Sequence, residues 1–529
     1  MRQTSKSLTR PAPVKGINAY DALGFMPEGY ALTLRNMFAQ PYGCQVRRGY
    51  VEHVTDLPGE VESLMSHNLG AAPKLYCVIA QEPGIASLYD VTAPNSNGTV
   101  ILENDLTNAR WQHINFPTVG GVFLVAVNGA DDGILIRPDN TVERLIAGDG
   151  TTANTIKGID PKLLVQVYSH QKRLWFVEKD STRAWYLPPD QFYGVATDFN
   201  PGSNWTRGGT LQMVITWTID SGNGADDHIA FISSMGEVSI YQGLDPDNAD
   251  TWALQGVYYA GAPVAGPRVA VKYGGDIAIL TQFGLVYLSS LLKSTKVNPA
   301  EENSGKYIQQ LVSQAATLHG DDFGWQPFIF PGANMFLINI PNTDTTSFQF
   351  VQNDITKSWS EFLGYNANCW ELHQELPFYG SFGAVYRAWE QWTDGAIVAN
   401  DGTITLGEQI RWEAQTTFSF FNEGPLQKQF HLVRPVIVSA GQFEISFSTN
   451  VNYSFNAPLS PATFESYQPG KWDEGLWDQA RWAGGLRTFM NWLGAEGIGI
   501  NASIRMLGRA SSETYWASTD WLYEPGGIL

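Results

Sequence analysis

The feature that most constrains the fold is a pattern that recurs seven times between residues 74 and 396. Each unit contains a short apolar strand, a turn rich in Gly, Asn, Asp or Ser, and a second apolar strand. The apolar cores are Leu75–Val78, Val122–Val125, Leu174–Val177, Ile229–Ile232, Ile277–Leu280, Phe336–Asn339 and Ala384–Tyr386. Markers at Tyr76, Phe123, Trp175, Phe231, Ala278, Leu337 and Val385 follow one another at steps of 47, 52, 56, 47, 59 and 48 residues. A period of about fifty residues with a hairpin in each unit predicts a β-propeller.

The repeat also suggests how the 529 residues divide into domains. We expect an N-terminal arm and platform-contributing segment over 1–60, a propeller over 61–410 and a C-terminal β-sandwich-like domain over 411–529. In the last region, Phe443–Ser448 alternates apolar and polar residues as a half-buried strand does. The first or last repeat can be shared between the chain ends, so the predicted all-β fold has six or seven blades.

Two local signals refine the prediction for the repeats. Apolar residues between Lys306 and Ala316 recur at helical spacing, which predicts one short helix between blades that ends near Gly320. Gly236 and Gly284 lie in predicted hairpin turns, where glycine supplies positive φ without a steric penalty. Residues 1–15 are polar and contain proline, and they predict an extended arm with little structure of its own.

Composition narrows the class of function. Aromatic residues make up 13% of the chain and charged residues only 16%, a balance that favours extensive contact surfaces. The formal net charge is −19, so the chain is not expected to hold nucleic acid by neutralising phosphates. An acidic wall would still let DNA slide past, although acidic surfaces are also common simply because they keep proteins soluble.

The cysteines and the start of the chain indicate where the protein folds. Cys44, Cys77 and Cys369 are odd in number and widely spaced, which predicts a reducing compartment and no disulfide framework. The basic segment 1–16 is not followed by an apolar stretch, so we expect no secretory signal, and no apolar run is long enough to span a membrane as a helix.

No motif for catalysis, cofactor binding or metal binding is evident in the sequence. The eight histidines are scattered, form no local pair, and are expected in turns or at the surface. Neither a GxSxG elbow nor a phosphate-binding loop is present. Asp220–Asp227 and Asp245–Asp250 are acidic, but they lack the ligand spacing of a calcium loop and are expected to be solvated turns. We therefore predict no catalytic residue, no cofactor and no metal ligand.

Seven residues are instead candidates for contact with other chains. Arginine and aromatic side chains are enriched at protein interfaces. The candidates are Arg47, Arg48, Tyr50, Trp472, Trp477, Trp482 and Trp492. Exposed tryptophans can also form sugar-binding platforms, so both interpretations of the 472–492 stretch stay open.

The two ends of the chain share motifs with a known family. The N-terminal segment contains Gly16–Asp21, Leu34–Phe38, Val46–Tyr50 and Leu57–Leu64, and the C-terminal region contains Phe420-Phe421, Lys428–Phe430, Val433–Pro435, Trp-Asp pairs at 472 and 477, and Tyr523–Gly527. With these motifs the chain resembles the tail-tube or nozzle structural proteins of short-tailed, podovirus-like bacteriophages.

The resemblance implies a structural virion protein without enzymatic activity. Such a protein forms a ring, usually a hexamer, contains a β-propeller in each subunit, extends the channel for genome ejection and binds an adaptor, or head-to-tail connector, and tail fibres or spikes. It implies assembly in the host cytoplasm, location in the tail of the virion, and passage of genomic DNA without specific binding. The alternatives are a propeller glycosidase or depolymerase acting on host surface glycan, and a receptor-binding tail module.

Overall fold

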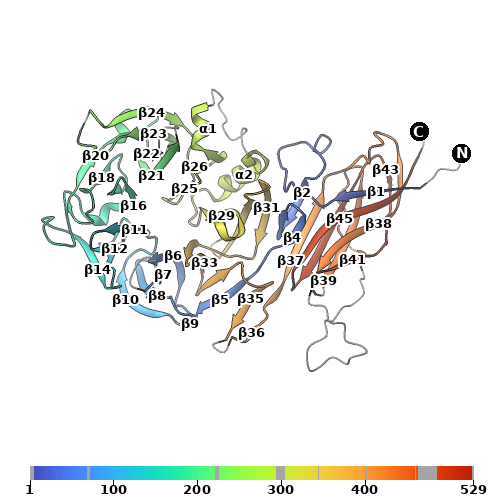
Figure 1. Cartoon of the computed structure of the whole chain (residues 1–529), viewed down its shortest axis with the longest axis horizontal. Coiled ribbons are helices and arrows are strands. Elements are labelled where there is room, and N and C mark those ends of the chain that lie inside the picture. Colours follow the sequence, from blue (N-terminus) through green and yellow to red (C-terminus); the bar gives the residue numbers. More distant parts are fainter. Residues whose placement is uncertain are drawn as a thin grey trace.

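The computed structural model describes residues 5–67, 72–220, 225–248, 250–293, 304–343, 345–399, 402–441, 443–458, 460–462 and 485–526. Figure 1 shows two β domains beside each other, a ring of small sheets and a two-layer sandwich. Both chain ends lie at the sandwich, so the chain enters the ring from the sandwich and returns to it.

The first five blades of the ring follow one another along the chain. Blade 1 contains β6 (Glu60–His67), β7 (Lys74–Glu82), β8 (Ile85–Asp90) and β10 (Thr99–Leu106). Blade 2 contains β11 (Gln112–Thr118), β12 (Gly121–Val127), β13 (Gly133–Ile136) and β14 (Val142–Ala147), extended by β15 (Thr155–Lys157) and β19 (Gly194–Val195). Blade 3 contains β16 (Leu164–His170), β17 (Arg173–Glu178), β18 (Ala184–Tyr186) and β20 (Thr197–Phe199). Blades 4 and 5 contain β21 (Leu211–Asp220), β22 (Ala225–Ser233), β23 (Glu237–Gln242) and β24 (Ala253–Tyr259), then β25 (Ala270–Tyr273), β26 (Asp276–Thr281) and β27 (Gly284–Tyr287).

The last two blades connect the ring to the rest of the chain. Blade 6 contains β28 (Gln326–Phe330), β29 (Met335–Thr343), β30 (Thr346–Asn353) and β31 (Ser358–Leu363). Blade 7 contains β32 (Cys369–His373), β33 (Leu376–Ser381), β34 (Ala384–Ala388) and the early strand β5 (Tyr50–Thr55). Since β5 pairs antiparallel with β34, a strand from the N-terminal part of the chain completes the final blade.

The ring is closed, and the predicted propeller is confirmed. Each inner strand contacts the next in the order β6, β11, β16, β21, β25, β28 and β32, and β32 contacts β6 again. In the part of the chain that the structure describes, the ring has seven blades rather than six: five are separate sheets, and blades 6 and 7 are parts of one sixteen-stranded sheet. Radial repetition leaves each blade with short, protected sheet edges.

Six of the seven sequence markers lie in the second strand of their blade, and the seventh does not. Val385 belongs to β34, the third strand of blade 7. The second strand is β33, whose sequence LPFYGS contains Pro377 and Gly380. These two residues are poor strand formers, so the repeat is hard to recognise there.

Short helices and one two-residue strand lie in the connections within and between blades. They are β9 (Asn95–Ser96), η1 (Pro161–Leu163), η2 (Pro201–Asn204), α1 (Leu288–Lys293), η4 (Ser304–Tyr307), α2 (Gln309–His319) and η5 (Pro331–Ala333). Helix α2 confirms the helix predicted between Lys306 and Ala316, and Gly320 follows its last residue. Its apolar face buries Val312, Ala315 and Ala316 in the core shared with blades 4 to 6.

The glycines predicted in hairpin turns have the expected backbone. Gly236 has φ of 86° and Gly284 has φ of 118°. A Cβ at Gly236 would lie 2.3 Å from the carbonyl carbon of Gly261, so the turn between β22 and β23 has no room for a side chain. This close approach lets the turn pack against the connection that leads to blade 5.

The second domain is a sandwich of two sheets. One sheet contains β2 (Ala31–Arg35), β37 (Glu408–Thr416), β44 (Ala502–Ala510), β39 (Phe443–Val451) and β40 (Ser460–Ala462). The other contains β3 (Met37–Gln40), β4 (Gly43–Val46), β45 (Thr514–Pro525), β38 (Lys428–Ser439), β41 (Arg487–Met490), β42 (Leu493–Gly494), β43 (Ile498–Gly499) and β1 (Lys6–Pro11). Trp412, Phe447 and Ile504 from the first sheet share one buried core with Val433 and Trp516 from the second.

Both chain ends therefore contribute to the same domain. The segment 1–60 and the domain 411–529, expected as two units, share this core because β2 pairs with β37 and β1 pairs with β45. Of the residues 1–15, expected as an extended arm, Lys6–Pro11 form strand β1 along β45. Strand β2 also pairs in parallel with β31 of blade 6, while β35 (Thr393–Val398) pairs with β5 on one side and β37 on the other, with β36 (Ile404–Thr405) at its end. The sandwich and the propeller are thus joined by continuous strand pairing.

Glutamine side chains link neighbouring inner strands where the blades diverge. The amide of Gln166 on β16 donates to the carbonyl of Val214 on β21 at 3.0 Å and accepts from its N–H at 2.8 Å. Gln326 on β28 makes the same pair of bonds to Trp370 on β32, both at 2.9 Å. Each side chain imitates a strand-pairing bond and satisfies two buried backbone groups that would otherwise lack a partner.

Replacing Gln166 with leucine should destabilise the propeller. The variant leaves the N–H and C=O of Val214 unpaired in the interior, so we expect the free energy of unfolding to fall by about 2 to 3 kcal/mol. Urea unfolding of the full-length chain measures this loss. The control is Gln310→Leu on the exposed side of α2, which should change the unfolding free energy by less than about 0.5 kcal/mol. Equal effects of the two variants would contradict the role of Gln166.

Candidate site in the central channel

A cavity of about 430 Å³ lies at the centre of the propeller. Its walls come from the inner strands of six blades and from the connection before β25. The polar and charged side chains at its surface are Gln112, His113, Gln166, Tyr168, Arg268, Lys272, Gln326 and Glu371. Apolar residues such as Met213, Phe328 and Leu372 complete the lining. The ring closure alone brings these groups together, because they are far apart in the sequence.

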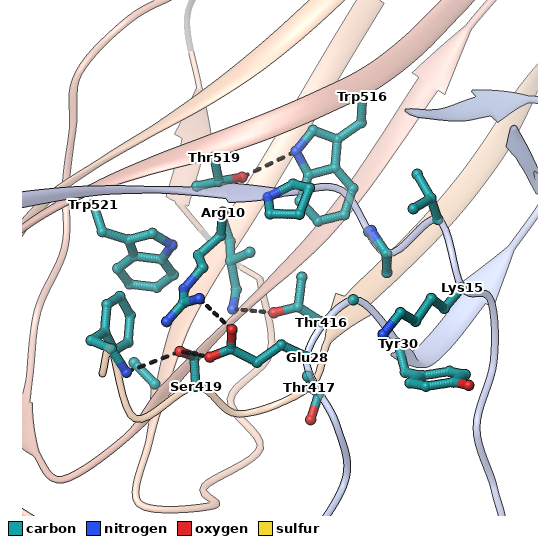
Figure 2. Close-up of a pocket in the computed structure, with 17 residues that line it drawn as sticks. Arg10, Lys15, Glu28, Tyr30, Thr416, Thr417, Ser419, Trp516, Thr519 and Trp521 are labelled. Carbon is teal, nitrogen blue, oxygen red and sulfur yellow. Dashed lines mark hydrogen bonds and ion pairs between the residues drawn. The ribbon is translucent and has the colours of Figure 1, made fainter. Parts of the chain in front are cut away.

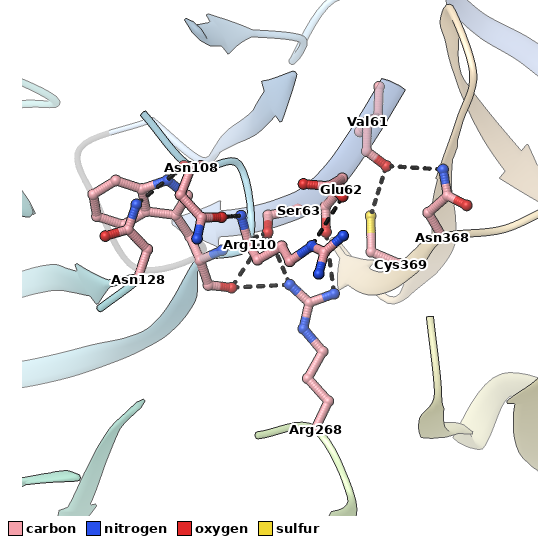
Figure 3. Close-up of polar contacts among 10 residues, drawn as sticks. Val61, Glu62, Ser63, Asn108, Arg110, Asn128, Arg268, Asn368 and Cys369 are labelled. Atoms are coloured by element: carbon pink, nitrogen blue, oxygen red, sulfur yellow. Dashed lines mark hydrogen bonds and ion pairs between the residues drawn. The ribbon is translucent and has the colours of Figure 1, made fainter. Parts of the chain in front are cut away.

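Arg268 crosses from the connection before β25 to the blades on the opposite side of the ring (Figure 3). Its guanidinium donates to the carbonyl oxygens of Glu62 at 3.2 Å and Trp111 at 2.9 Å, and to the Ser63 hydroxyl at 2.8 Å. Arg110, which lies beside it, pairs with the Glu62 carboxylate at 3.0 Å. Arg268 therefore connects blade 5 to blades 1 and 2 and obstructs the channel.

Glu371 and His113 face each other across the cavity wall. The Nε2 atom of His113 is 3.7 Å from Oε1 of Glu371, and their side chains are 15% and 21% exposed, respectively. Burial raises the pKa of Glu371 to about 8, although the Arg268 charge opposes this rise. Burial, together with the same Arg268 charge, lowers the pKa of His113 to about 4. Near neutral pH both groups are uncharged, and Arg268 is the charged group between them.

Within the described residues, Glu371 is the one carboxylate that lines this cavity. The glycosidase alternative requires two carboxylates flanking a glycosidic bond. Glu62, the nearest other acidic group around Arg268, is held by Arg110. The cavity lining therefore does not supply the second carboxylate of that mechanism among these residues, and its chemistry is that of a binding site rich in donors.

The expected surface position of the histidines is wrong for five of the eight. Five histidine side chains are buried: His53, His67, His170, His228 and His373. His67, His170 and His373 are the last residues of β6, β16 and β32, the inner strands of blades 1, 3 and 7. An alignment of the repeats would show that these three histidines occupy the same position, at the end of an inner strand. Their irregular spacing along the chain hides this common position.

A second cavity, of about 260 Å³, lies in the sandwich beneath β1 (Figure 2). Most of its wall is apolar, including Phe421, Trp516 and Trp521. At its edge Arg10 forms an ion pair with Glu28, and the Ser419 hydroxyl donates to the same carboxylate at 2.7 Å. These contacts fasten the N-terminal strand over the space between the two sheets.

The structure places Arg47 in the interior. Its side chain is fully buried and forms two bonds to the Asp394 carboxylate, at 2.8 and 2.7 Å. It also donates to the Asn36 side chain and to the Leu363 carbonyl, and its guanidinium lies 4.3 Å from the ring centroid of Tyr365. Arg47 cannot contact another chain from this position. It joins the sandwich to blades 6 and 7, a role that its short sequence context does not reveal.

The other interface candidates have different surroundings. Arg48 is exposed, with its guanidinium 5.1 Å from the ring of Trp392. Tyr50 is half-buried and packs edge-to-face against Tyr365, Tyr379 and Tyr386. Trp492 is 42% exposed under the Arg434 guanidinium, at 4.6 Å. Trp472, Trp477 and Trp482 lie outside the described residues. Among the candidates that the structure describes, Arg48 and Trp492 have the side chains most accessible to a partner.

The acidic turns make contacts inside the chain where they are described. Asp245 accepts a bond from Arg173 at 2.9 Å, and Asp247 accepts one from the Tyr186 hydroxyl at 2.5 Å. Most of the turn between Asp220 and Asp227 lies outside the described residues. Across the described ranges, no cluster of three His, Cys, Asp or Glu side chains could hold a metal ion. In the same ranges, no helix has both the length and the apolar character needed to cross a membrane.

Comparison with known proteins gives structural likenesses only. No protein-family model matches the sequence, and no curated protein matches it. Among solved structures, the chain is similar to BBS1N in complex with ARL6DN, with 11% identity over 65% of this chain and 98% of that chain and a TM-score of 0.38. It is also similar to the β-propeller domain of Myceliophteria thermophila Cps50 (Swd1), with 10% identity over 63% of this chain and 100% of that chain and a TM-score of 0.36. The propeller assigned above is defined by the strand pairing of this chain itself.

Proposed function

We propose that this chain is a structural subunit of a short phage tail, a nozzle or tail-tube protein that assembles into a ring. The observation that carries the proposal is the position of the segments that resemble this family. They come from both ends of the sequence, and several of them fold into one sandwich, through β2 and β3 from the first end and β38 and β45 from the second. Another, Leu57–Leu64, leads into β6 of blade 1. The sandwich is joined to the propeller by strand pairing, so each subunit would offer two connected surfaces for the contacts that close a ring.

In this proposal the genome passes between subunits and not through a propeller. Within each subunit, Arg268 spans the channel of the propeller. The remaining cavity of about 430 Å³ is the size of a small-molecule pocket. Six copies would therefore surround a common passage with acidic walls, because the chain has a net charge of −19. The subunits would assemble in the host cytoplasm and reside in the tail of the virion.

Several large apolar side chains are exposed and are available for contacts with other proteins. Phe25, Leu318, Phe382 and Leu244 are between 67% and 88% exposed. Large apolar side chains with this exposure favour protein contacts when they gather on an assembled surface. The partners that the proposal assigns to such surfaces are the neighbouring subunits, the adaptor or head-to-tail connector, and the tail fibres or spikes.

Native mass spectrometry of the purified full-length chain tests the proposal. We expect a species with six times the 58.4 kDa mass of one chain, and a population that increases with protein concentration. A single chain at every concentration, together with the release of reducing sugar ends from host surface polysaccharide, would contradict the structural role and support the enzyme instead.

A further inference from the structure

The central channel contains hydrogen-bond donors that the protein does not use. A guanidinium has five N–H groups, and Arg268 uses three of them on Glu62, Ser63 and Trp111. In the described part of the chain, neither Glu371 nor His113 makes a side-chain hydrogen bond, and Nε2 of His113 lies 3.7 Å from Oε1 of Glu371. Three side chains from blades 2, 5 and 7 thus present polar atoms to one cavity.

The charge of the cavity wall is opposite to that of the whole chain. Arg268 and Lys272 are the cations at the wall, and Glu371 is its one carboxyl group within the described residues. Since burial keeps that carboxyl protonated near neutral pH, the wall carries net positive charge within a chain of net charge −19. A protonated carboxyl, a neutral imidazole and a guanidinium all donate hydrogen bonds, so an anionic oxygen fits among them.

We propose that the propeller channel binds a small organic monocarboxylate, whose carboxylate group lies among Arg268, His113 and Glu371. A carboxylate matches the planar guanidinium, and one negative charge balances the one charge of Arg268. The cavity of about 430 Å³ leaves room for a compact body beyond the carboxylate, and Met213, Phe328 and Leu372 offer it an apolar wall. This site belongs to each subunit separately, so it does not depend on ring assembly.

The first test is calorimetric titration of the full-length protein with benzoate and, separately, with glucuronate at about pH 7. We expect one site per chain for at least one of these probes. Benzamide has the shape of benzoate without its charge and should bind at least about 10-fold more weakly, because it lacks the charge-assisted bonds. Absence of binding by both acids up to about 10 mM would overturn the proposal. A dissociation constant of about 10 mM corresponds to a binding free energy of only about −3 kcal/mol. Equal binding of benzoate and benzamide would also overturn it.

A second test uses the ionisation of Glu371. At about pH 9, one unit above its pKa of about 8, roughly nine-tenths of this group is ionised and repels a bound carboxylate. The affinity of the wild-type protein should therefore fall about 10-fold between pH 7 and pH 9. Glu371→Gln keeps an N–H donor and cannot ionise, so its affinity should stay within about 2-fold across the same range.

The other ionisable groups at the cavity should not cause this loss of affinity between pH 7 and pH 9. Burial lowers the pKa of His113 to about 4 and raises the pKa values of Tyr168 and of Cys369 behind the wall, the latter to about 12. The remaining charged groups around the site are Lys272, Glu62, Arg110 and Arg268. The matched control is Glu375→Gln, the same substitution on the exposed turn after β32, which should lose affinity with pH as the wild type does. Loss of affinity at pH 9 in Glu371→Gln as well would overturn the assignment of Glu371.

Discussion

The stability of the propeller should fall steeply as the pH is lowered from about 6.5 to about 4. Burial lowers the pKa values of His53, His113 and His170 to about 4, and that of His373 also lies below its ordinary value. His53 lies 2.8 Å from the Val91 carbonyl and His170 lies 3.0 Å from the Thr216 hydroxyl, both in closely packed surroundings. At each of these sites burial disfavours the charged imidazole.

The sign of this effect follows from where protons bind. In the unfolded chain a histidine takes up its proton near pH 6.5, whereas in the folded chain these three take it up near pH 4. Acid therefore favours the unfolded state, and the stability present above pH 6.5 is lost as the pH falls to 4. Each histidine contributes up to about 3 kcal/mol, so three approach the total stability of about 5 to 15 kcal/mol of a typical protein.

Urea unfolding at a series of pH values measures this loss. Replacing His170 with glutamine removes one of the three protonation sites, so the slope of stability against pH between 4 and 6.5 should decrease by about a third. Glu371 provides a control of opposite sign, because its raised pKa gives stability at low pH that is lost as the pH rises from about 4.5 to about 8. Glu371→Gln should abolish that loss. Unchanged stability between pH 4 and 6.5 would contradict the burial of these histidines.

Arg47→Met should destabilise the junction of the two domains by about 3 to 5 kcal/mol. The variant removes the partner of Asp394 and leaves that carboxylate, only 21% exposed, without a counter-charge. It also leaves the Leu363 carbonyl and the Asn36 side chain without their donor. Because the loss arises from the uncompensated charge, adding Asp394→Leu to the variant should restore part of the stability.

The neighbouring arginine supplies a matched control. Arg48→Met removes an exposed guanidinium that contacts Trp392, so its cost should stay below about 1 kcal/mol. Thermal unfolding of the two variants side by side gives the comparison. A loss for Arg48→Met as large as that for Arg47→Met would contradict the buried position of Arg47 and its role between the domains.

The propeller is predictable from the sequence because its second strands are continuous apolar runs. Six of these runs follow one another at about fifty residues, and together they define most blades. The pairing of β5 with β34 was not predictable, because nothing near residue 50 indicates that its partner lies at residues 384–388. The shared sandwich was missed for the same reason. Local patterns specify strands, and only long-range pairing decides which strands become neighbours.

The channel site was beyond the reach of sequence patterns for a related reason. His113, Arg268 and Glu371 belong to different blades, and the closure of the ring brings them to one cavity. Glu371 is the one residue whose sequence context indicates a site. It lies in the middle of the strand Cys369–His373, where burying a carboxylate is costly unless it has a partner. Arg47 illustrates the opposite case: a residue type typical of interfaces is buried, because Asp394 on β35 neutralises its charge.

Cryo-electron microscopy of the purified, assembled protein is the decisive measurement for the proposed role. The proposal predicts a closed ring of six copies with an opening between subunits wide enough for a DNA duplex, while Arg268 blocks the channel of every propeller. Images of separate propeller–sandwich units, or of copies joined head to tail without closing, would contradict it.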